Sequence, residues 1–184
     1  MGWKGNTSTP GRIFGNVVDT IIRQAMCDVI LVKFAENFQS IHQVKRWLVP
    51  MSGGPNAPLA VKLLPALIKS STEVENREIC LTQIYKPFVN NPDTTVLETA
   101  ISELIRYPNL EKSVIYQCLQ ADSVVEEIIN LVKSDNYEMV ILGASCAGLL
   151  QQAIQGNIPE AIASSVDSTV ILVRGKIADK LLMM

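Results

Sequence analysis

Two short apolar runs, which enclose a glycine-rich loop and a helical segment, constrain the fold of this chain most strongly. Residues 139–142 form the first run, which stops at Gly143, and residues 170–173 form the second. Short β-branched runs on either side of a helix are typical of buried parallel strands joined by a crossover. A glycine directly after a strand lets a ligand approach the backbone, and a helix that begins after Gly156 offers free N–H groups to a phosphate. The stretch therefore predicts a β-α-β unit with a candidate phosphate loop.

The same pattern occurs a second time near the start of the chain. At an offset of 141 positions (143 − 2), glycines and a strand core align without a gap: Gly2 with Gly143, Gly15 with Gly156, and residues 29–32 with residues 170–173. Two glycines and a strand core seldom coincide by chance, so we interpret the match as an internal repeat of domain size. We therefore expect residues 1–34 to be the last helix and strand of a first domain whose beginning is absent.

The order of elements in the rest of the chain predicts a doubly wound α/β domain. Strand-like runs occupy residues 46–51, 78–84, 113–118, 138–142 and 168–173. Amphipathic helical patterns lie between them, the third of them capped by Asp122 or Ser123. The residues expected to face inward are Leu59, Leu63, Leu64, Leu67 and Ile68 in the first helix, Val96, Leu97, Ala100 and Leu104 in the second, and Val124, Val125, Ile128, Ile129 and Val132 in the third. This alternation predicts a parallel sheet with helices on both faces, whose ligands bind where the ends of the first and fourth strands meet.

Composition and charge argue against several classes of function. A hydrophobic content of 48% with 18% charged residues is typical of a well-packed soluble domain. The net charge of −2 provides no basic surplus for nucleic acid. No apolar run approaches the roughly 20 residues that span a bilayer, and no signal peptide is visible, so we expect a cytoplasmic chain. The single histidine, His42, argues against a histidine metal cluster or a Ser-His-Asp triad.

The four cysteines are far apart and form no Cys-x-x-Cys pair. Cys80 and Cys118 lie inside strand-like runs, where we expect small buried thiols. Cys146 lies in the glycine-rich loop instead. Two interpretations of Cys146 are open: a redox sensor at a helix start, and a substitution that fills the loop, which we favour because no basic neighbour is evident.

Taken together, these features resemble the universal stress protein family. The resemblance rests on the run Leu48-Val49-Pro50 with its following turn, the strand that ends at Gly143, and the glycine spacing before the last helix. It covers nearly the whole chain. It implies a complete domain at residues 46–175, after a linker at 35–45 and before a tail at 176–184.

The fold implied by this resemblance is a five-stranded parallel sheet of order 3-2-1-4-5, of the adenine nucleotide alpha hydrolase-like type. Fifth strands in similar proteins pair antiparallel across a twofold, in a homodimer or between tandem domains. We therefore expect residues 28–33 to form an extra antiparallel edge strand on residues 168–173, which would cover an open edge.

The resemblance also implies ATP or AMP, with Mg²⁺, as candidate ligands. The candidate nucleotide-binding residues are Pro50, Ser52, Leu142, Gly143, Cys146, Gly156, Asn157 and Ile158, and a second half-site comprises Gly2, Gly5, Gly15 and Asn16. ATP-binding members carry Gly-x2-Gly-x9-Gly-(Ser/Thr) at this loop. Here Cys146 replaces the second glycine, Asn157 replaces the Ser or Thr, and Ser52 stands where relatives usually have an acidic residue. These departures predict weakened or absent nucleotide binding.

Alternatives are open for the residues and for the function. Gly143 fits both the approach of a ligand and a plain turn after a strand, and Gly156-Asn157 fits both phosphate contact and helix capping alone. The competing functions are a regulatory module, a pure assembly module that binds no ATP, a genuine ATP or AMP sensor, and a slow ATPase. The ATPase is the weakest, because no base, nucleophile or metal-binding carboxylate set lies near the loop. Tandem copies in this family also form cytoplasmic tails of permeases, antiporters and channels, so a transporter in the parent chain is a further expectation.

Overall fold

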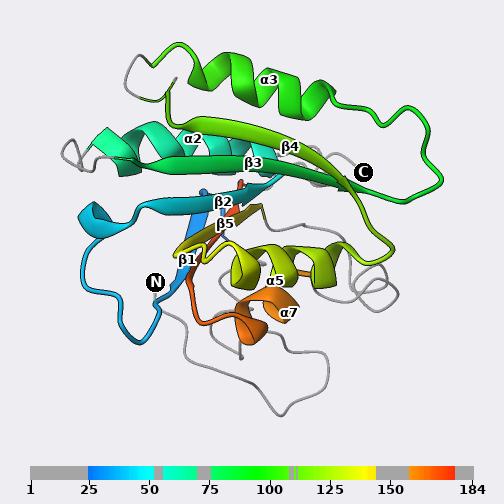
Figure 1. The fold of residues 1–184 in the computed structure, drawn as a ribbon. Helices are drawn as coiled ribbons and strands as arrows, with labels where there is room; N and C mark the ends of the chain where they lie inside the picture. Colours follow the sequence, from blue (N-terminus) through cyan, green and yellow to red (C-terminus); the bar gives the residue numbers. More distant parts are fainter. Residues whose placement is uncertain are drawn as a thin grey trace.

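A six-stranded, mostly parallel sheet forms the centre of the protein, and helices cover both of its faces (Figure 1). The computed structural model describes residues 25–51, 56–69, 76–107, 110, 112–143 and 158–176. Within this part of the chain, the strands are β1 (Val29–Lys33), β2 (Arg46–Pro50), β3 (Glu78–Tyr85), β4 (Val114–Gln120), β5 (Met139–Gly143) and β6 (Thr169–Arg174). The expected α/β class is confirmed.

The strands lie side by side in the order β1-β6-β5-β2-β3-β4. All neighbours from β6 to β4 are parallel, while β1 pairs antiparallel with β6. This antiparallel pair is the one expected for the N-terminal strand. The residues of β6 and the first four of β5 are all buried, because layers pack on both faces of the sheet.

The helices form two layers, each with its own hydrophobic cluster. Helices α2 (Ala57–Lys69) and α3 (Thr95–Leu104) pack on one face, and α5 (Val124–Ser134) and α7 (Ile158–Ser165) pack on the other (Figure 1). None of the helices in the described part combines the length and the apolar character needed to cross a membrane. The two layers leave the carboxyl ends of the parallel strands at one edge, where the candidate site is expected.

The start of α5 shows how local sequence sets a boundary. Ser123 has an extended backbone, and its hydroxyl oxygen accepts a hydrogen bond from the backbone N–H of Glu126 at 3.3 Å. This is the bond that an N-cap residue makes to a free N–H of the first turn. Glu126 and Glu127 also place negative charge near the positive end of the helix dipole. Of the two expected caps, Ser123 is the one that makes this bond.

Two expectations about burial are wrong, and both concern the β4 side of the sheet. Val96 was expected to face inward but is 42% exposed, and Cys118 was expected to be buried but is exposed. Cys118 lies on the edge strand β4, where no further strand follows among the described residues. An apolar pattern in sequence cannot show that a strand will lie at an edge.

Helix α2 turns a different stripe toward the sheet from the one expected. Leu64 and Ile68 are buried as predicted, whereas the neighbouring leucines are only partly buried: Leu59, Leu63 and Leu67. Small residues take the central positions instead, namely Ala57, Ala60 and Val61. Small side chains let the helix backbone approach the strands closely, and the leucines then pack at the flanks. In α5, likewise, Ile128 and Val132 are buried, while Val124, Val125 and Ile129 are partly buried.

The expected linker at residues 35–45 is an integral part of the core. It contains a short 3₁₀ helix, η1 (Ile41–Gln43), and Phe38 packs against the same cluster as α2. Val44 is buried, and its carbonyl oxygen accepts a hydrogen bond from the indole N–H of Trp47 at 3.1 Å. The segment therefore ties β1 to the rest of the sheet. The helix expected after Asn16 falls on residues outside the described part.

Candidate functional site

The carboxyl ends of β2 and β5 lie next to each other, as expected from the predicted topology. The two strands pair in parallel, with Trp47 opposite Met139 and Leu48 opposite Val140. Pro50 ends β2 and Gly143 ends β5, so both candidate residues lie at the same edge of the sheet. The winding of the sheet reverses here, which is where doubly wound proteins bind ligands.

The start of α2 lies directly against Gly143. A Cβ atom at Gly143 would lie 2.6 Å from the backbone nitrogen of Ala57 and 2.6 Å from the carbonyl carbon of Asn56. Distances this short are not tolerated between real atoms, so the position requires glycine. The sequence allowed either a ligand or a plain turn at Gly143, and in the structure the backbone at the start of α2 lies against it.

Asn56 connects the start of α2 to the end of β6. Its backbone carbonyl accepts hydrogen bonds from Leu59 N at 3.1 Å and Ala60 N at 3.2 Å, which begin the helix. Its side-chain Oδ1 accepts a hydrogen bond from the backbone N–H of Gly175 at 3.0 Å. Asn56 is buried, so this hydrogen bond holds the start of α2 and the end of β6 together inside the protein.

Leu142 and Ile158 make apolar contacts next to the site. Leu142 is buried in the hydrophobic cluster on the α5 and α7 face. Ile158 begins α7 and packs against the same cluster. Pro50 is buried as well, at the end of β2. Of the candidate residues that the structure describes, none presents a polar side chain to a ligand.

The remaining candidate residues lie outside the described part of the chain. These are Ser52, Cys146, Gly156 and Asn157 of the main site, and Gly2, Gly5, Gly15 and Asn16 of the second half-site. Their roles stay predictions from the sequence. In the described ranges, no group of His, Cys, Asp and Glu side chains has the geometry to hold a metal ion.

The hydrogen bond between the Asn56 side chain and Gly175 could not be predicted from the sequence, because the two residues are distant in the chain. Asn56 follows a proline and precedes an apolar helical pattern, which is an ordinary N-cap signal. The signal marks the helix start but cannot reveal a bond to Gly175, which lies 119 positions further along.

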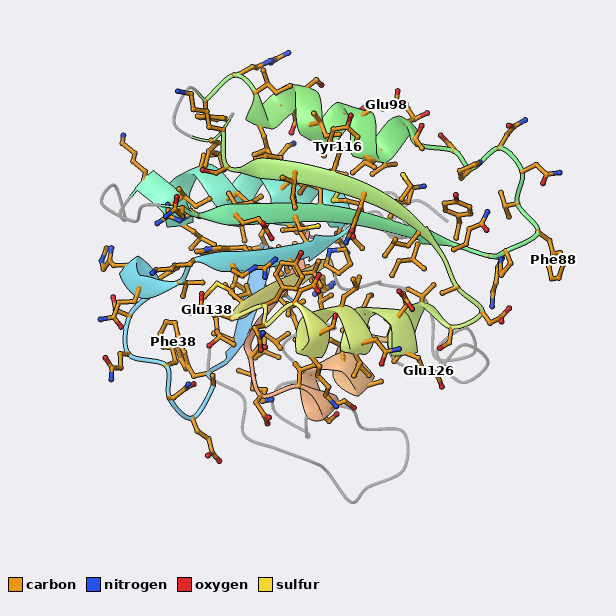
Figure 2. The ribbon with its side chains drawn as sticks, in the orientation of Figure 1. Phe38, Phe88, Glu98, Tyr116, Glu126 and Glu138 are labelled. Carbon is orange, nitrogen blue, oxygen red and sulfur yellow. The ribbon has the colours of Figure 1, made fainter. Side chains whose placement is uncertain are left out.

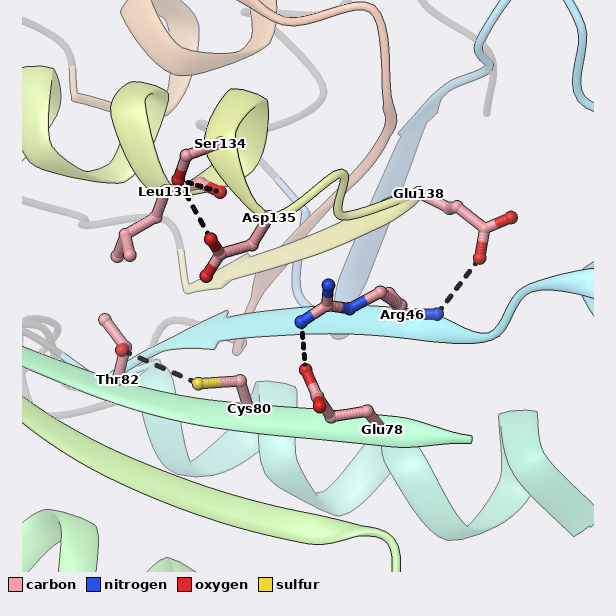
Figure 3. Close-up of polar contacts among 8 residues, drawn as sticks. All are labelled: Arg46, Glu78, Cys80, Thr82, Leu131, Ser134, Asp135 and Glu138. Atoms are coloured by element: carbon pink, nitrogen blue, oxygen red, sulfur yellow. Dashed lines mark hydrogen bonds and ion pairs between the residues drawn. The ribbon is translucent and has the colours of Figure 1, made fainter. Parts of the chain in front are cut away.

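A second polar cluster lies at the opposite end of β2 and β3. The Arg46 guanidinium forms an ion pair with Glu78 (Figure 3). Its central carbon lies 4.9 Å from the centre of the Tyr137 ring. Beneath it, the buried Cys80 thiol lies 3.8 Å from the Thr82 hydroxyl. Burial raises the pKa of the Cys80 thiol, and burial together with a hydrogen bond to Cys80 raises the pKa of Tyr137. Both groups are therefore held neutral, and the cluster stabilises the fold rather than supplying a reactive thiolate.

The raised pKa of Tyr137 makes stability fall in alkaline solution. The unfolded chain releases the Tyr137 proton near the ordinary value of about 10, whereas the folded chain retains it to higher pH. Above that value the unfolded state binds fewer protons, so the free energy of unfolding decreases as pH rises. We expect Tyr137→Phe to reduce this loss in urea titrations between roughly pH 9 and pH 11. Tyr116→Phe, at an exposed site, serves as the control. An unchanged alkaline loss in Tyr137→Phe would contradict the assignment.

A cavity of about 410 Å³ lies at the amino ends of β2, β5 and β6, away from the candidate site. Two of its polar lining residues, Glu138 and Thr169, accept hydrogen bonds from the backbone of residues 35–46. Glu138 Oε2 accepts hydrogen bonds from Lys45 N at 2.6 Å and Arg46 N at 3.0 Å, and Ser168 Oγ donates to the carbonyl of Tyr137 at 2.6 Å. Phe38 and Glu138 lie on the same side of the molecule (Figure 2). The cavity therefore lies between residues 35–45 and the sheet.

The strand order and the edge formed by Pro50, Asn56 and Gly143 define a doubly wound α/β protein with its candidate site at the switch point. Within this class, the chain is similar to universal stress proteins. Universal stress protein Rv2623 of Mycobacterium tuberculosis strain H37Rv and its counterpart in strain CDC 1551 are each 22% identical to it over 189 residues. The match covers 95% of this chain and 60% of the relatives, so the chain spans about 60% of their length. No family model matches the sequence.

Solved structures show the same fold. A universal stress protein from Archaeoglobus fulgidus superposes with a TM-score of 0.66 at 15% identity, covering 96% of this chain and 60% of that one. A universal stress protein in complex with cAMP gives a TM-score of 0.57 at 14% identity, covering 73% of this chain and 99% of that one. These similarities show that the chain shares the fold of these universal stress proteins.

Proposed function

We propose that this chain is a cytoplasmic regulatory module of universal-stress type in which adenine nucleotide binding is weakened or absent. Residues 46–175 form its complete domain, and residues 1–34 are the end of a preceding copy. The register of β1 against β6 is the observation that carries the proposal.

The pairing of β1 with β6 obeys the 141-position offset of the sequence repeat. Val29 pairs with Arg174, and Lys33 pairs with Val170. The offset relates Val29 to Val170 (29 + 141) and Lys33 to Arg174 (33 + 141). Each of these two pairs therefore corresponds to the other under the repeat. Leu31 pairs with Leu172, and these two are equivalent to each other. Any antiparallel pair of equivalent strands allows this exchange, and here equivalent residues also lie opposite each other at the centre, so the pairing is consistent with the repeat.

Hydrogen bonds at the two ends of the pair follow the same relation. The backbone N–H of Ala35 donates to Thr169 Oγ1 at 3.1 Å, and the backbone N–H of Lys176 donates to Asp28 Oδ1 at 2.8 Å. The offset relates Asp28 to Thr169 and Ala35 to Lys176. At one end of each strand, a side-chain oxygen thus accepts a hydrogen bond from a backbone N–H. The accepting side chain is Thr169 in one case and Asp28 in the other. Two such bonds are difficult to explain without common descent of the two segments.

Lys33 joins the N-terminal strand to helix α7. Its ammonium group donates hydrogen bonds to the carbonyls of Ala163 at 2.7 Å and Val166 at 2.6 Å. These carbonyls lie at the end of α7, where the helix dipole favours a positive charge. Helix α7 starts directly after Gly156-Asn157, so the end of the first copy is attached to the helix that follows the glycine motif. We infer that the paired strands are the working surface through which the two copies communicate.

Two observations support weak or absent nucleotide binding. The space beside Gly143 is filled by the start of α2, so this glycine has a structural reason that needs no nucleotide. Cys146 and Ser52 also depart from the pattern of ATP-binding relatives. One solved relative is in complex with cAMP, so that nucleotide belongs in the test.

Calorimetric titration with ATP, ADP, AMP and cAMP, with and without Mg²⁺, tests the proposal. We expect no saturable binding at concentrations below about 1 mM. The double variant Ser52→Asp with Cys146→Gly restores the acidic residue and the second glycine, and we expect it to gain measurable ATP binding. The further change Gly156→Trp, which fills the loop, serves as the control and should abolish that gain.

Saturable micromolar binding by the unmodified chain, lost in Gly156→Trp, would overturn the weakened-binding proposal in favour of a nucleotide sensor. The transporter-tail hypothesis stays a prediction that the described residues do not test.

A further inference from the structure

The outer edge of β4 is open among the described residues. β4 is the last strand of the sheet, so one row of its backbone N–H and C=O groups has no neighbouring strand there. Its seven residues, VIYQCLQ, include no charged residue and no proline. Natural edge strands usually carry such residues because they prevent pairing with other chains. The edge of β4 therefore lacks the usual protection against pairing with another strand.

Apolar side chains on both faces of β4 are exposed to solvent. Tyr116 is 66% exposed and Ile115 is 45% exposed, and they lie on opposite faces because side chains alternate along a strand. Tyr116 lies on the side of β4 that faces α3 (Figure 2). Cys118, on the same face as Tyr116, is exposed as well. A partner strand would therefore gain apolar contacts on both faces of the sheet.

We propose that a second copy of this chain pairs antiparallel with β4 and extends the sheet across a twofold axis at Gln117. In this register Ile115 lies opposite Leu119 of the second copy, and Tyr116 lies opposite Cys118 of the second copy. Uncharged, largely apolar residues then meet at the two positions on either side of the axis. On the axis the two Gln117 residues lie opposite each other.

Charges at the two ends of the strand favour a second copy over an unrelated peptide. Lys112 and Asp122 are both exposed and both lie five positions from Gln117 (117 − 112 and 122 − 117). Lys112 lies in the turn just before β4 and Asp122 in the bend just after it, so antiparallel pairing about Gln117 places the Lys112 end of each copy beside the Asp122 end of the other. A parallel pairing would bring like charges together. The complementarity is thus specific to one orientation of one partner.

The size of the surface sets the expected strength. A strand of seven residues is roughly 23 Å long, and stable dimers bury about 800 Å² on each partner. A single strand edge of this length is a small surface by that standard. We therefore expect a concentration-dependent dimer with a dissociation constant in the micromolar range.

Sedimentation velocity of the full chain between roughly 1 and 200 µM tests the proposal through a charge exchange. Lys112→Asp and Asp122→Lys each replace two attractive pairs by two repulsive pairs, and each should weaken the dimer about tenfold. The double variant restores opposite charges and should return to within about threefold of the original affinity. Met26→Lys is the matched control, because Met26 is 79% exposed and precedes β1 at the opposite edge of the sheet, and this variant should dimerise normally.

Circular dichroism distinguishes loss of pairing from loss of folding, and only variants with the original spectrum are compared. A chain that stays monomeric over the whole range overturns the proposal. So does a dimer that neither single exchange weakens, or one that the double variant fails to recover.

Discussion

Gly143→Ala is expected to destabilise the fold by about 3 kcal/mol, near the upper end of the cost of overpacking a core. The added Cβ lies 2.6 Å from Ala57 N, 2.6 Å from Asn56 C and 2.8 Å from Asn56 O. All three are backbone atoms at the start of α2, so they cannot move without shifting the helix. The backbone of Gly143 is not in the left-handed region, so the expected cost is steric. Urea unfolding followed by far-UV circular dichroism measures it.

Gly175→Ala provides the matched comparison at the same edge. Its Cβ would lie 3.0 Å from Asn56 Oδ1, which belongs to a side chain and can move by a few tenths of an ångström. We expect a loss of about 1 kcal/mol, mainly from the strained bond between Asn56 and Gly175. Equal losses in the two variants would show that the approach of α2 to Gly143 is looser than described here.

Leu31→Ala is expected to cost about 3 kcal/mol, as for other buried leucines. Leu31 is only 2% exposed and belongs to the hydrophobic cluster that also contains Leu172 and Val140. Its removal leaves a cavity on the inner face of β1, at the centre of the pairing with β6. The loss appears in the main unfolding transition only if β1 unfolds together with the sheet.

Ile30→Ala is the control for Leu31→Ala on the same strand. Ile30 precedes Leu31 but lies on the opposite face and is 40% exposed. We expect its replacement to cost about 0.5 kcal/mol. If Leu31→Ala also left the transition unchanged, β1 would have to detach before the rest of the sheet unfolds, and the proposed communication through the paired strands would fail.

The fold could be predicted from the sequence where local pattern and burial agree. The runs that became β5 and β6 are continuously apolar because both faces of the sheet are covered, and their β-branched residues mark them as strands. Val96 and Cys118 failed for the opposite reason. Their apolar character resembles that of core residues, and only the complete strand order shows that they lie at the β4 side of the sheet.

The candidate site could be predicted only in outline. The sequence suggested either a ligand or a plain turn at Gly143. In the structure, the backbone of Asn56 and Ala57 lies against it, from a segment nearly 90 positions earlier (143 − 56 and 143 − 57). The bond between Asn56 and Gly175 likewise joins segments with no local signal for each other. Contacts of this kind depend on how layers pack, which periodicity along one segment does not encode.

The pairing of β1 with β6 has a consequence for the order of events during synthesis. The paired residues are 137 to 145 positions apart (170 − 33 and 174 − 29). At a ribosomal rate of about 5–20 residues per second, β1 leaves the ribosome roughly 7 to 28 s before its partner is complete. During that interval its apolar residues have no strand to pair with, and β1 is available to chaperones or to neighbouring nascent chains. β6, which is made after β1, thus covers β1, and the exposure of β1 ends when the sheet is complete.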